Sequence, residues 1–287
     1  MNNEVKNALR SPFIKIMLAA VVLVIITVVV FLAMGYRFVS TDEGYRFFGK
    51  ASGGQEMTGT IRYPNGDTAT LDFAAGKIVF SNGDVYEGNI SGIYRNGKGK
   101  MTYAATGDVY EGDFLNDEIT GMGTYTYANG DVYVGSLMSG KKHGSGKYTM
   151  SGGSSYEGSF SDNMMHGSGT YRWASGAVYE GEFKNDLKDG KGVFTSAEGD
   201  VYNGEYKADK RNGYGVYTWK NGETYTGYFL DDYMDTRLRN DDGSFRYDDK
   251  DDYVHRGESV YTWPNGHSYT GYFVENKIVV VPFGGNN

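Results

Sequence analysis

Hydrophobic residues are arranged in two ways along this chain: one continuous stretch near its start, and alternation with polar residues afterwards. The stretch at residues 16–36 carries no formal charge, and Thr27 interrupts it. About 20 apolar residues are enough for a helix to cross the hydrocarbon core of a bilayer. The pattern therefore predicts a transmembrane helix at 16–36, preceded by an N-terminal tail at 1–15.

The charges beside this stretch predict how it lies in a membrane. Three basic residues precede it and one follows it: Lys6, Arg10, Lys15 and Arg37. The excess of positive charge before the stretch favours a cytoplasmic N-terminus, with the rest of this single-pass protein outside the cytoplasm. Small residues at Ala33 and Gly35 also suit signal-peptidase cleavage. We favour an uncleaved anchor, because the stretch is longer than the apolar core of a usual signal peptide.

Beyond residue 40 the hydrophobic pattern has a period of two, which is typical of β-strands. In YEGEF (residues 179–183) the aromatic residues and glycine fall on one face, and the two glutamates fall on the other. In GKGVF (residues 190–194) the glycines and phenylalanine again share a face. The alternation predicts a sheet with one aromatic–glycine face and one hydrated face.

The same strand pattern repeats along the chain, mostly at intervals of 23 residues. Each copy has Tyr-x-Gly, then a polar stretch, then Gly-x-Gly followed by aromatic or apolar residues. The Tyr-x-Gly copies begin at Tyr86, Tyr110, Tyr133, Tyr156, Tyr179, Tyr202, Tyr225 and Tyr269. Self-similarity at such a period is typical of a repeat protein in which each unit is one supersecondary element.

The positions of the aromatic residues, which alternate along each strand, predict the length of the turn inside each unit. In YTWKNGETYTGYF (residues 217–229) a two-residue turn at Asn-Gly would place the two aromatic sets on opposite faces. A three-residue turn closed by a left-handed glycine instead pairs Tyr217 with Tyr225 and Gly215 with Gly227. We therefore predict left-handed glycines at Gly66, Gly83, Gly130, Gly222 and Gly266.

This repeat resembles the MORN (membrane occupation and recognition nexus) repeat, which has the same Tyr-Glu-Gly-x-Phe, Gly-x-Gly and Asn-Gly-Asp elements. The resemblance covers roughly residues 60–275. It implies an all-β fold: one elongated antiparallel sheet of about eight or more 23-residue hairpin repeats, here preceded by one transmembrane helix. It also implies membrane-linked scaffolding and assembly, and in some cases phospholipid binding.

The boundaries of the remaining segments follow from where the repeat is regular. Residues 230–260 are acidic and could hold a worn repeat rather than an inserted segment. An apolar strand from Ile278 would close the sheet and stop at Pro282. The predicted segments are a linker or first cap at 37–58, a degenerate repeat at 59–84, regular repeats at 85–229, the acidic segment at 230–260, and the last repeat with a C-terminal cap at 261–287.

Composition excludes several functional classes. The chain has 43 glycines, 26 tyrosines and no cysteine, with a net charge of −8. Tyrosine therefore has to replace leucine in the core, and disulfides, thiolate metal sites and cysteine nucleophiles are excluded. The negative charge opposes nucleic-acid binding. No catalytic motif or cofactor motif is present, and His143 and His166 are copies of one repeat position, so we expect neither catalytic residues nor a cofactor.

The clustered charges have simple explanations. Nine aspartates lie between residues 231 and 253, but the spacing of an EF-hand is absent, so a solvated loop is favoured over a weak cation site. Basic residues near positions 141, 188 and 210 are expected in long, solvated hairpin loops. The weak cation candidates are Asp241, Asp242, Asp248, Asp249, Asp251 and Asp252.

Together these features predict a noncatalytic, membrane-anchored scaffold or adaptor that binds a protein partner on its extended sheet. The alternative is a carbohydrate-binding module, because aromatic rows can stack on sugars, and a phospholipid-binding module is less favoured. Oligomerisation is left open. The partner-binding candidates, for which a packing role is the stronger interpretation, are Tyr156, Phe160, Tyr171, Trp173, Tyr179, Phe183, Tyr217, Trp219, Tyr225 and Phe229.

Overall fold

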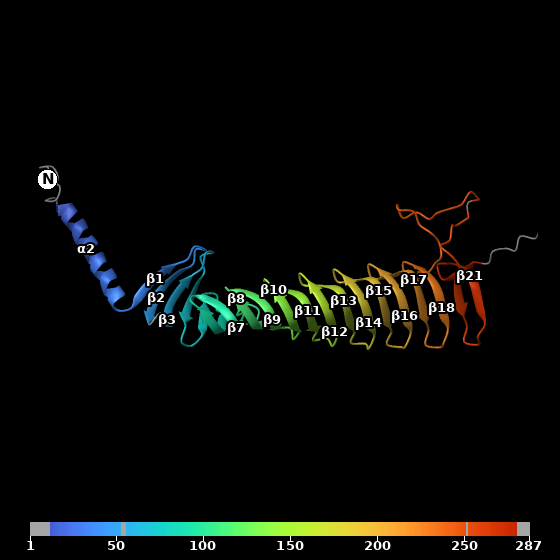
Figure 1. Ribbon diagram of the computed structural model, residues 1–287, viewed down its shortest axis with the longest axis horizontal. Coiled ribbons are helices and arrows are strands. Elements are labelled where there is room, and N and C mark those ends of the chain that lie inside the picture. The colour runs from blue at the N-terminus through green and yellow to red at the C-terminus, as the bar shows by residue number, and fades with distance from the viewer. Residues whose placement is uncertain (1–11, 53–55, 251, 280–287) are drawn as a thin grey trace, which may run out of the picture. The chain divides into compact units, whose positions relative to one another are not determined.

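The computed structural model describes residues 12–52, 56–250 and 252–279. Apart from one helix, the fold consists of 22 strands in one antiparallel sheet (Figure 1). The chain divides into two compact units, the first ending at Ile119 and the second beginning at Thr120. The predicted fold class is confirmed.

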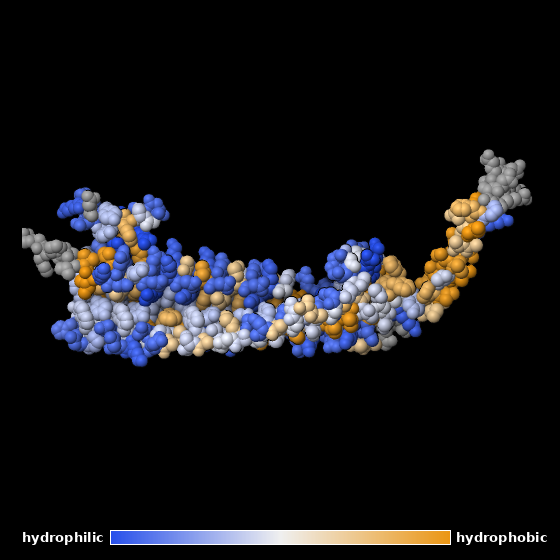
Figure 2. Space-filling model, turned by 180° about the vertical axis from the view of Figure 1, so that it is seen from behind, coloured by the Kyte–Doolittle hydropathy of each residue, from blue (hydrophilic) through white to orange (hydrophobic). Residues whose placement is uncertain are grey.

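Helix α2 (Pro12–Ala33) begins and ends earlier than the predicted 16–36. Gly35, with φ of 87°, follows the helix in the left-handed conformation that commonly ends a helix. Tyr36 therefore belongs to the first strand. None of the residues of α2 is buried, and Figure 2 shows its hydrophobic surface in orange. The helix is long and apolar enough to cross a membrane, a test that a signal sequence also passes.

Unit 1 contains strands that pair with one another in chain order. They are β1 (Tyr36–Ser40), β2 (Arg46–Ser52), β3 (Glu56–Arg62), β4 (Thr68–Asp72), β5 (Lys77–Phe80), β6 (Val85–Ser91), β7 (Tyr94–Thr102) and β8 (Val109–Leu115). The segment predicted as a linker or first cap, 37–58, contains β1, β2 and the start of β3, apart from residues 53–55, which lie outside the described part.

Most of the regular repeats lie in unit 2, one hairpin for each 23 residues, although the first of them lies in unit 1. The strands of unit 2 are β9 (Glu118–Thr126, beginning just before the unit), β10 (Val132–Met138), β11 (Lys141–Thr149), β12 (Ser155–Ser161), β13 (Met164–Arg172), β14 (Val178–Lys184), β15 (Leu187–Thr195), β16 (Val201–Lys207), β17 (Lys210–Thr218), β18 (Thr224–Leu230), β19 (Tyr233–Met234), β20 (Ser259–Thr262), β21 (Ser268–Val274) and β22 (Lys277–Val279). From β9 to β18 each strand pairs with the next (Figure 1).

The predicted three-residue turn is confirmed. Tyr217 pairs with Tyr225 and Gly215 pairs with Gly227. The N–H of Trp219 donates to the carbonyl of Glu223 across the turn at 2.9 Å. All five predicted glycines are left-handed, with φ between 84° and 94°. The alternation of aromatic and polar residues was therefore enough to fix the register.

The other turn of each hairpin differs from the prediction. Between β14 and β15 it has only two residues, Asn185 and Asp186, with φ of 51° and 69°. Positive φ at both positions is the type I′ geometry that suits a tight hairpin. The basic residues near 141, 188 and 210 consequently lie in strands β11, β15 and β17, and the prediction of long loops there was wrong.

The two positions of each Gly-x-Gly require glycine for different physical reasons. Gly190 has φ of 110° and lies beside a register shift between Gly181 and Phe183, where a side chain would strain the backbone. Gly192 has ordinary φ, but the ring of Tyr179 covers it, so an added Cβ would collide with that ring. The Tyr179 hydroxyl passes over the glycines and donates to the carbonyl of Glu182 at 3.1 Å.

The core is a band of aromatic rings on the glycine face. Tyr156 is fully buried, and its ring centroid lies 5.0 Å from that of Phe160. Residues four apart in a flat strand are about 13 Å apart, so the strand bends at the glycine and bulge between them. The bend brings the rings together edge to face, and a single sheet thereby acquires a core.

The acidic segment is an insertion and not a worn repeat. Strand β18 pairs with β19 and also directly with β20, so the described residues between 235 and 258 add no strand to the regular sheet. We call residues 235–256 the arm; residue 251 lies outside the described part. Isolated bridges, such as Arg237 with His255, hold its two sides together. Figure 1 shows the arm projecting from the sheet beside β18 and β21. The predicted stop at Pro282 lies outside the described residues, whereas Ile278 is in β22.

Candidate functional site

Burial divides the predicted partner-binding residues into two groups. Six of them are at most 5% exposed and belong to the core: Tyr156, Phe160, Tyr179, Phe183, Tyr225 and Phe229. The other four are partly exposed: Tyr171, Trp173, Tyr217 and Trp219. The buried six cannot touch a partner in this fold, and only the second group is available for contact.

The accessible aromatic residues form close, tilted pairs along one row of unit 2. The ring centroids of Tyr171 and Trp173 lie 4.6 Å apart, as do those of Tyr217 and Trp219. Phe194 occupies the equivalent place in the repeat between them, and its ring lies 5.7 Å from that of Trp173. Phe194 was not among the predicted partner-binding residues, although its 23-residue spacing from Tyr171 and Tyr217 is visible in the sequence.

Basic side chains lie against these rings at a single repeat position. The Lys142 ammonium is 4.3 Å from the centroid of the Tyr148 ring, and burial lowers its pKa. The Lys188 ammonium is 5.2 Å from Tyr206, and the Arg211 guanidinium is 5.2 Å from Tyr217. These are cation–π distances. We call the combined surface the aromatic trough; it comprises Tyr171, Trp173, Lys188, Phe194, Arg211, Tyr217 and Trp219.

Two hollows lie in the trough. One, of about 220 Å³, is lined by Lys188, Phe194, Arg211 and Tyr217 among others. The second, of about 330 Å³, is lined in part by Arg211, Tyr217 and Trp219. Because the hollows share Arg211 and Tyr217, they follow one another along the row. The trough therefore offers apolar ring surface in three successive repeats and a cation in two of them, at Lys188 and Arg211; Met165 takes the equivalent position in the repeat of Tyr171. Asp209 and Asp232 also line the hollows.

The turns of unit 2 hold the trough cations in place. The Arg211 amide donates to Oδ1 of Asp232 at 2.9 Å, and its guanidinium donates to the Asp232 carbonyl at 2.7 Å. The Lys188 amide donates to Oδ1 of Asp209, also at 2.9 Å. Each aspartate is the second residue of the next type I′ turn. Neighbouring hairpins are thus fastened together at the edge where the cations lie.

Acidic residues after the three-residue turns fasten the other edge of the sheet. The carboxylate of Asp131 accepts a hydrogen bond from the Tyr148 hydroxyl and one from the Ser151 amide. These two donors lower the pKa of Asp131 to about 2. Asp200 accepts equivalent bonds from Tyr217 and Lys220. These charges are structural, because they join each turn to the next one.

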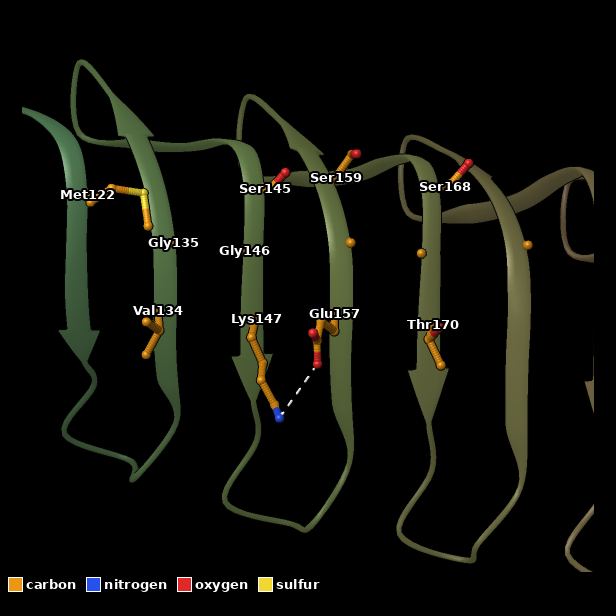
Figure 3. Close-up of a pocket in the computed structure, with 13 residues that line it drawn as sticks. Met122, Val134, Gly135, Ser145, Gly146, Lys147, Glu157, Ser159, Ser168 and Thr170 are labelled. Carbon is orange, nitrogen blue, oxygen red and sulfur yellow. Dashed lines mark ion pairs between the residues drawn. The ribbon is translucent and has the colours of Figure 1, made fainter.

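The opposite face of unit 2 carries a larger groove, of about 720 Å³, whose lining includes the apolar side chains of Met122 and Val134 (Figure 3). Glycine backbone forms part of its lining, Ser145, Ser159 and Ser168 lie on one side, and Lys147 and Glu157 lie on the other. Lys147 and Glu157 form an ion pair at 3.6 Å. The groove offers small hydroxyls and paired charges, and no aromatic ring lines it.

The arm does not gather its acidic residues into a cation site. Within the described residues, no group of three or more His, Asp or Glu side chains is placed to hold a metal ion. Asp242 instead accepts hydrogen bonds from Ser244, and Asp248 accepts from the amides of Lys250 and Asp252. These bonds shape the tight turns of the arm. Of the cation candidates, Asp251 lies outside the described residues.

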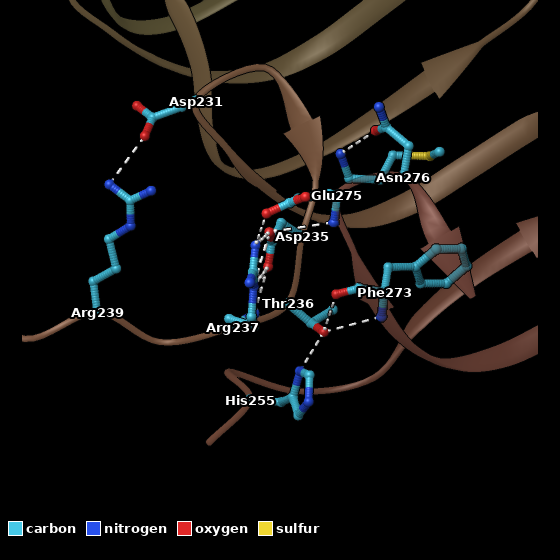
Figure 4. Close-up of polar contacts among 10 residues, drawn as sticks. Asp231, Asp235, Thr236, Arg237, Arg239, His255, Phe273, Glu275 and Asn276 are labelled. Atoms are coloured by element: carbon cyan, nitrogen blue, oxygen red, sulfur yellow. Dashed lines mark hydrogen bonds and ion pairs between the residues drawn. The ribbon is translucent and has the colours of Figure 1, made fainter. Parts of the chain in front are cut away.

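A buried polar cluster fastens the arm to the last hairpin (Figure 4). Arg237 forms ion pairs with Asp235 at 2.6 Å and with Glu275 at 2.9 Å. Thr236 donates to the carbonyl of Phe273 and contacts the Nδ1 of His255. This cluster was not predicted, because its members are up to 40 residues apart and those of the arm lie outside the repeat.

A family model described as MORN repeat matches seven segments, which together cover just over half of the chain. The seven are residues 86–105, 110–132, 133–155, 156–178, 179–201, 202–224 and 257–268. The gap before the last segment contains the arm. The sequence matches no curated protein.

Several solved structures show weak likeness to this chain. The TCP10 domain of Danio rerio CPAP, in complex with a peptide of Danio rerio STIL, has 14% identity and a TM-score of 0.38, covering 83% of this chain and 99% of that one. The TCP10c domain of Drosophila melanogaster Sas-4 has 12% identity and a TM-score of 0.19, covering 83% and 99%. Virginiamycin B lyase from Staphylococcus aureus has 9% identity and a TM-score of 0.15, covering 84% and 85%. At these scores, the likenesses say nothing about function.

Proposed function

Because this chain belongs to the MORN repeat family, we propose that it is a noncatalytic, membrane-anchored scaffold that binds an extended segment of a partner protein in its aromatic trough. The family supports an interaction module or a membrane-associated module in general terms. The trough supports the more specific choice of a protein ligand, and α2 supports attachment to a membrane.

The observation that carries this proposal is the row of rings in three successive repeats, with a cation against the rings in two of them. Two strands at about 4.8 Å each advance the sheet by roughly 10 Å per repeat. An extended peptide covers that distance in about three residues. A segment lying along the trough would therefore present every third residue to an equivalent place. Proline or apolar side chains suit the Tyr–Trp pairs, and acidic side chains suit Lys188 and Arg211.

A photo-reactive amino acid tests which face binds. We expect p-benzoylphenylalanine at Trp219, on the trough, to cross-link one defined partner in cells. The matched control is the same substitution at Tyr214, which lies in β17 just before Trp219, faces the other way and is 46% exposed. In the purified complex, Lys188→Gln should weaken binding roughly fivefold, because a cation–π contact contributes about 1 kcal/mol. Cross-linking from Tyr214 alone would reject the trough.

The carbohydrate alternative gives a different result. If the trough binds glycans, the protein should bind a glycan array without any partner protein, and Trp173→Ala and Trp219→Ala should abolish that binding. Binding to vesicles that is lost with the same two substitutions would instead favour phospholipid in the trough. Either outcome would replace the protein-binding proposal.

The proposed topology is an uncleaved α2, a cytoplasmic N-terminus and repeats outside the cytoplasm. Its support is the 22-residue apolar helix, which has no buried residue, and the basic residues before it. We expect protease added to intact cells to digest the repeats while the N-terminus stays protected. Digestion only after lysis would reverse the orientation, and an N-terminus at Tyr36 in the mature protein would show cleavage.

A further inference from the structure

An aromatic cluster joins the end of α2 to the first hairpin of unit 1. Phe31, in the last turns of the helix, lies 5.2 Å from Tyr36 and 6.0 Å from Phe48, measured between ring centroids. Tyr36 and Phe48 stack at 5.6 Å across β1 and β2. The apolar surface of the helix therefore continues onto one face of the sheet.

That face leaves large phenyl groups in the solvent. Phe38 is 66% exposed and Phe48 is 46% exposed, and the two residues are paired across β1 and β2. Phe47, on the other face of the same hairpin, is fully buried. A contiguous exposed apolar patch of this kind is uncommon on a protein surface that faces only water, and it marks an interaction site.

Basic residues share the face with these rings. In the strand register Arg46 pairs with Arg62 in β3, and Lys50 pairs with Tyr36 in β1. All three basic residues are exposed. The loop that joins β1 and β2 carries two exposed acids, Asp42 and Glu43, and Glu43 accepts a hydrogen bond from Tyr94 at 3.1 Å. We call this surface the juxtamembrane platform: Phe31, Tyr36, Phe38, Phe48, Arg46, Lys50 and Arg62.

The short connection after α2 limits where the platform can lie. The helix has 22 residues and is about 33 Å long, close to the roughly 30 Å hydrocarbon core. Only Met34 and Gly35 separate α2 from β1, and two residues reach at most about 7 Å. If α2 spans a bilayer, β1 begins inside the headgroup layer, which extends about 5–8 Å beyond the core.

We propose that the juxtamembrane platform lies on the membrane surface, with Phe38, Phe48 and Tyr36 among the headgroups of anionic lipids. This inference rests on the proposed anchoring by α2. Aromatic residues are preferred at the membrane interface. The positive charges of arginine and lysine are attracted to anionic headgroups by simple electrostatics on either side of the membrane. The net negative charge of the whole chain does not oppose this contact, because the platform carries its own local positive charge.

Single-cysteine labelling tests the proposal, because the chain contains no cysteine of its own. The full-length protein carrying Phe38→Cys would be labelled with an environment-sensitive fluorophore and reconstituted in phosphatidylcholine–phosphatidylglycerol vesicles. We expect a blue-shifted emission that doxyl-labelled lipid quenches. Val39→Cys is the matched control, because Val39 is the next residue, faces the other side and is 38% exposed; its label should stay in water.

A third label separates this proposal from the anchoring on which it rests. Val21→Cys lies in the middle of α2, and its label should be quenched by lipid if the helix spans the bilayer. Quenching at position 21 without quenching at 38 would overturn the platform and leave the anchor intact. No quenching at position 21 would overturn the anchor itself.

Two further measurements test whether the basic residues contribute and whether lipid or a second copy covers the platform. Replacing Arg46, Lys50 and Arg62 by glutamine should reduce the blue shift at position 38 in anionic vesicles and leave it unchanged in pure phosphatidylcholine. Equal quenching at 38 and 39 would reject a face-specific contact. A blue shift at 38 that rises with the protein-to-lipid ratio, and that lipid quenchers do not affect, would assign the platform to contact with a second copy.

Discussion

Arg237→Met should release the arm from the repeat sheet and lower the free energy of unfolding by about 3–5 kcal/mol, the usual effect of breaking a buried ion pair. The Arg237 side chain is only 4% exposed and Asp235 only 2%. The substitution leaves the Asp235 carboxylate buried without its partner. It also removes the guanidinium from above the Phe245 ring, which it contacts at 3.8 Å. Thermal unfolding and the rate of trypsin cleavage within the arm report the change.

Arg239→Ala is the matched control for this prediction. Arg239 lies two residues away in the same arm and forms an ion pair with Asp231 at 3.1 Å, but its side chain is 36% exposed. A solvent-exposed pair contributes only about 0–1 kcal/mol. Equal destabilisation by Arg237→Met and Arg239→Ala would contradict a buried anchor. Replacing Asp235 and Arg237 together by apolar residues should restore much of the stability, because no unpaired charge then remains buried.

Gly192→Ala should destabilise unit 2 by about 1–3 kcal/mol, although it adds only one methyl group. The new Cβ would collide with the ring of Tyr179, which is fully buried and has no room to move. A protein of this size loses roughly 2–4 °C in Tm for each kcal/mol, and circular dichroism measures that loss. The effect should be local to the hairpins around β14 and β15, which amide hydrogen exchange resolves.

Gly152→Ala provides the control for the added methyl group. Gly152 lies in a turn of the same unit, has ordinary φ, and has no atom within 4 Å of the place that its Cβ would occupy. We expect its Tm to match that of the unchanged protein. If Gly192→Ala were equally harmless, the Tyr179 ring would not cover the glycine in solution, and the explanation of Gly-x-Gly given above would be wrong.

Much of the fold could be predicted because the relevant rules are local. The period of two placed Tyr179 and Gly181 on one face, and the parity of Tyr217 and Tyr225 selected a three-residue turn over a two-residue one. The type I′ turns escaped prediction because their residues, such as Asn185 and Asp186, also suit a longer polar loop. The basic residues beside them were assigned to that loop for the same reason.

The candidate site was predictable only in part. The aromatic face was identified, but sequence could not separate the accessible Tyr217 and Trp219 from the buried Tyr225 and Phe229. All four share a face, and their difference in burial depends on where the strand bends. The position of Lys188 and Arg211 against the rings depends on the same bend. The 23-residue spacing of Lys188 and Arg211 is visible in the sequence, but it does not show that their side chains contact aromatic rings.

The sequence by itself determined the repeat, the hairpin unit, the family and the register of the three-residue turn, since each follows from backbone geometry over a few residues. The tertiary structure alone decided which aromatic residues are core, because bulges next to the glycines bend the strands and close the rings on one another. It also decided that the acidic segment is an arm. Arg237 and Glu275 are 38 residues apart, and a local sequence pattern cannot predict an ion pair between residues so far apart.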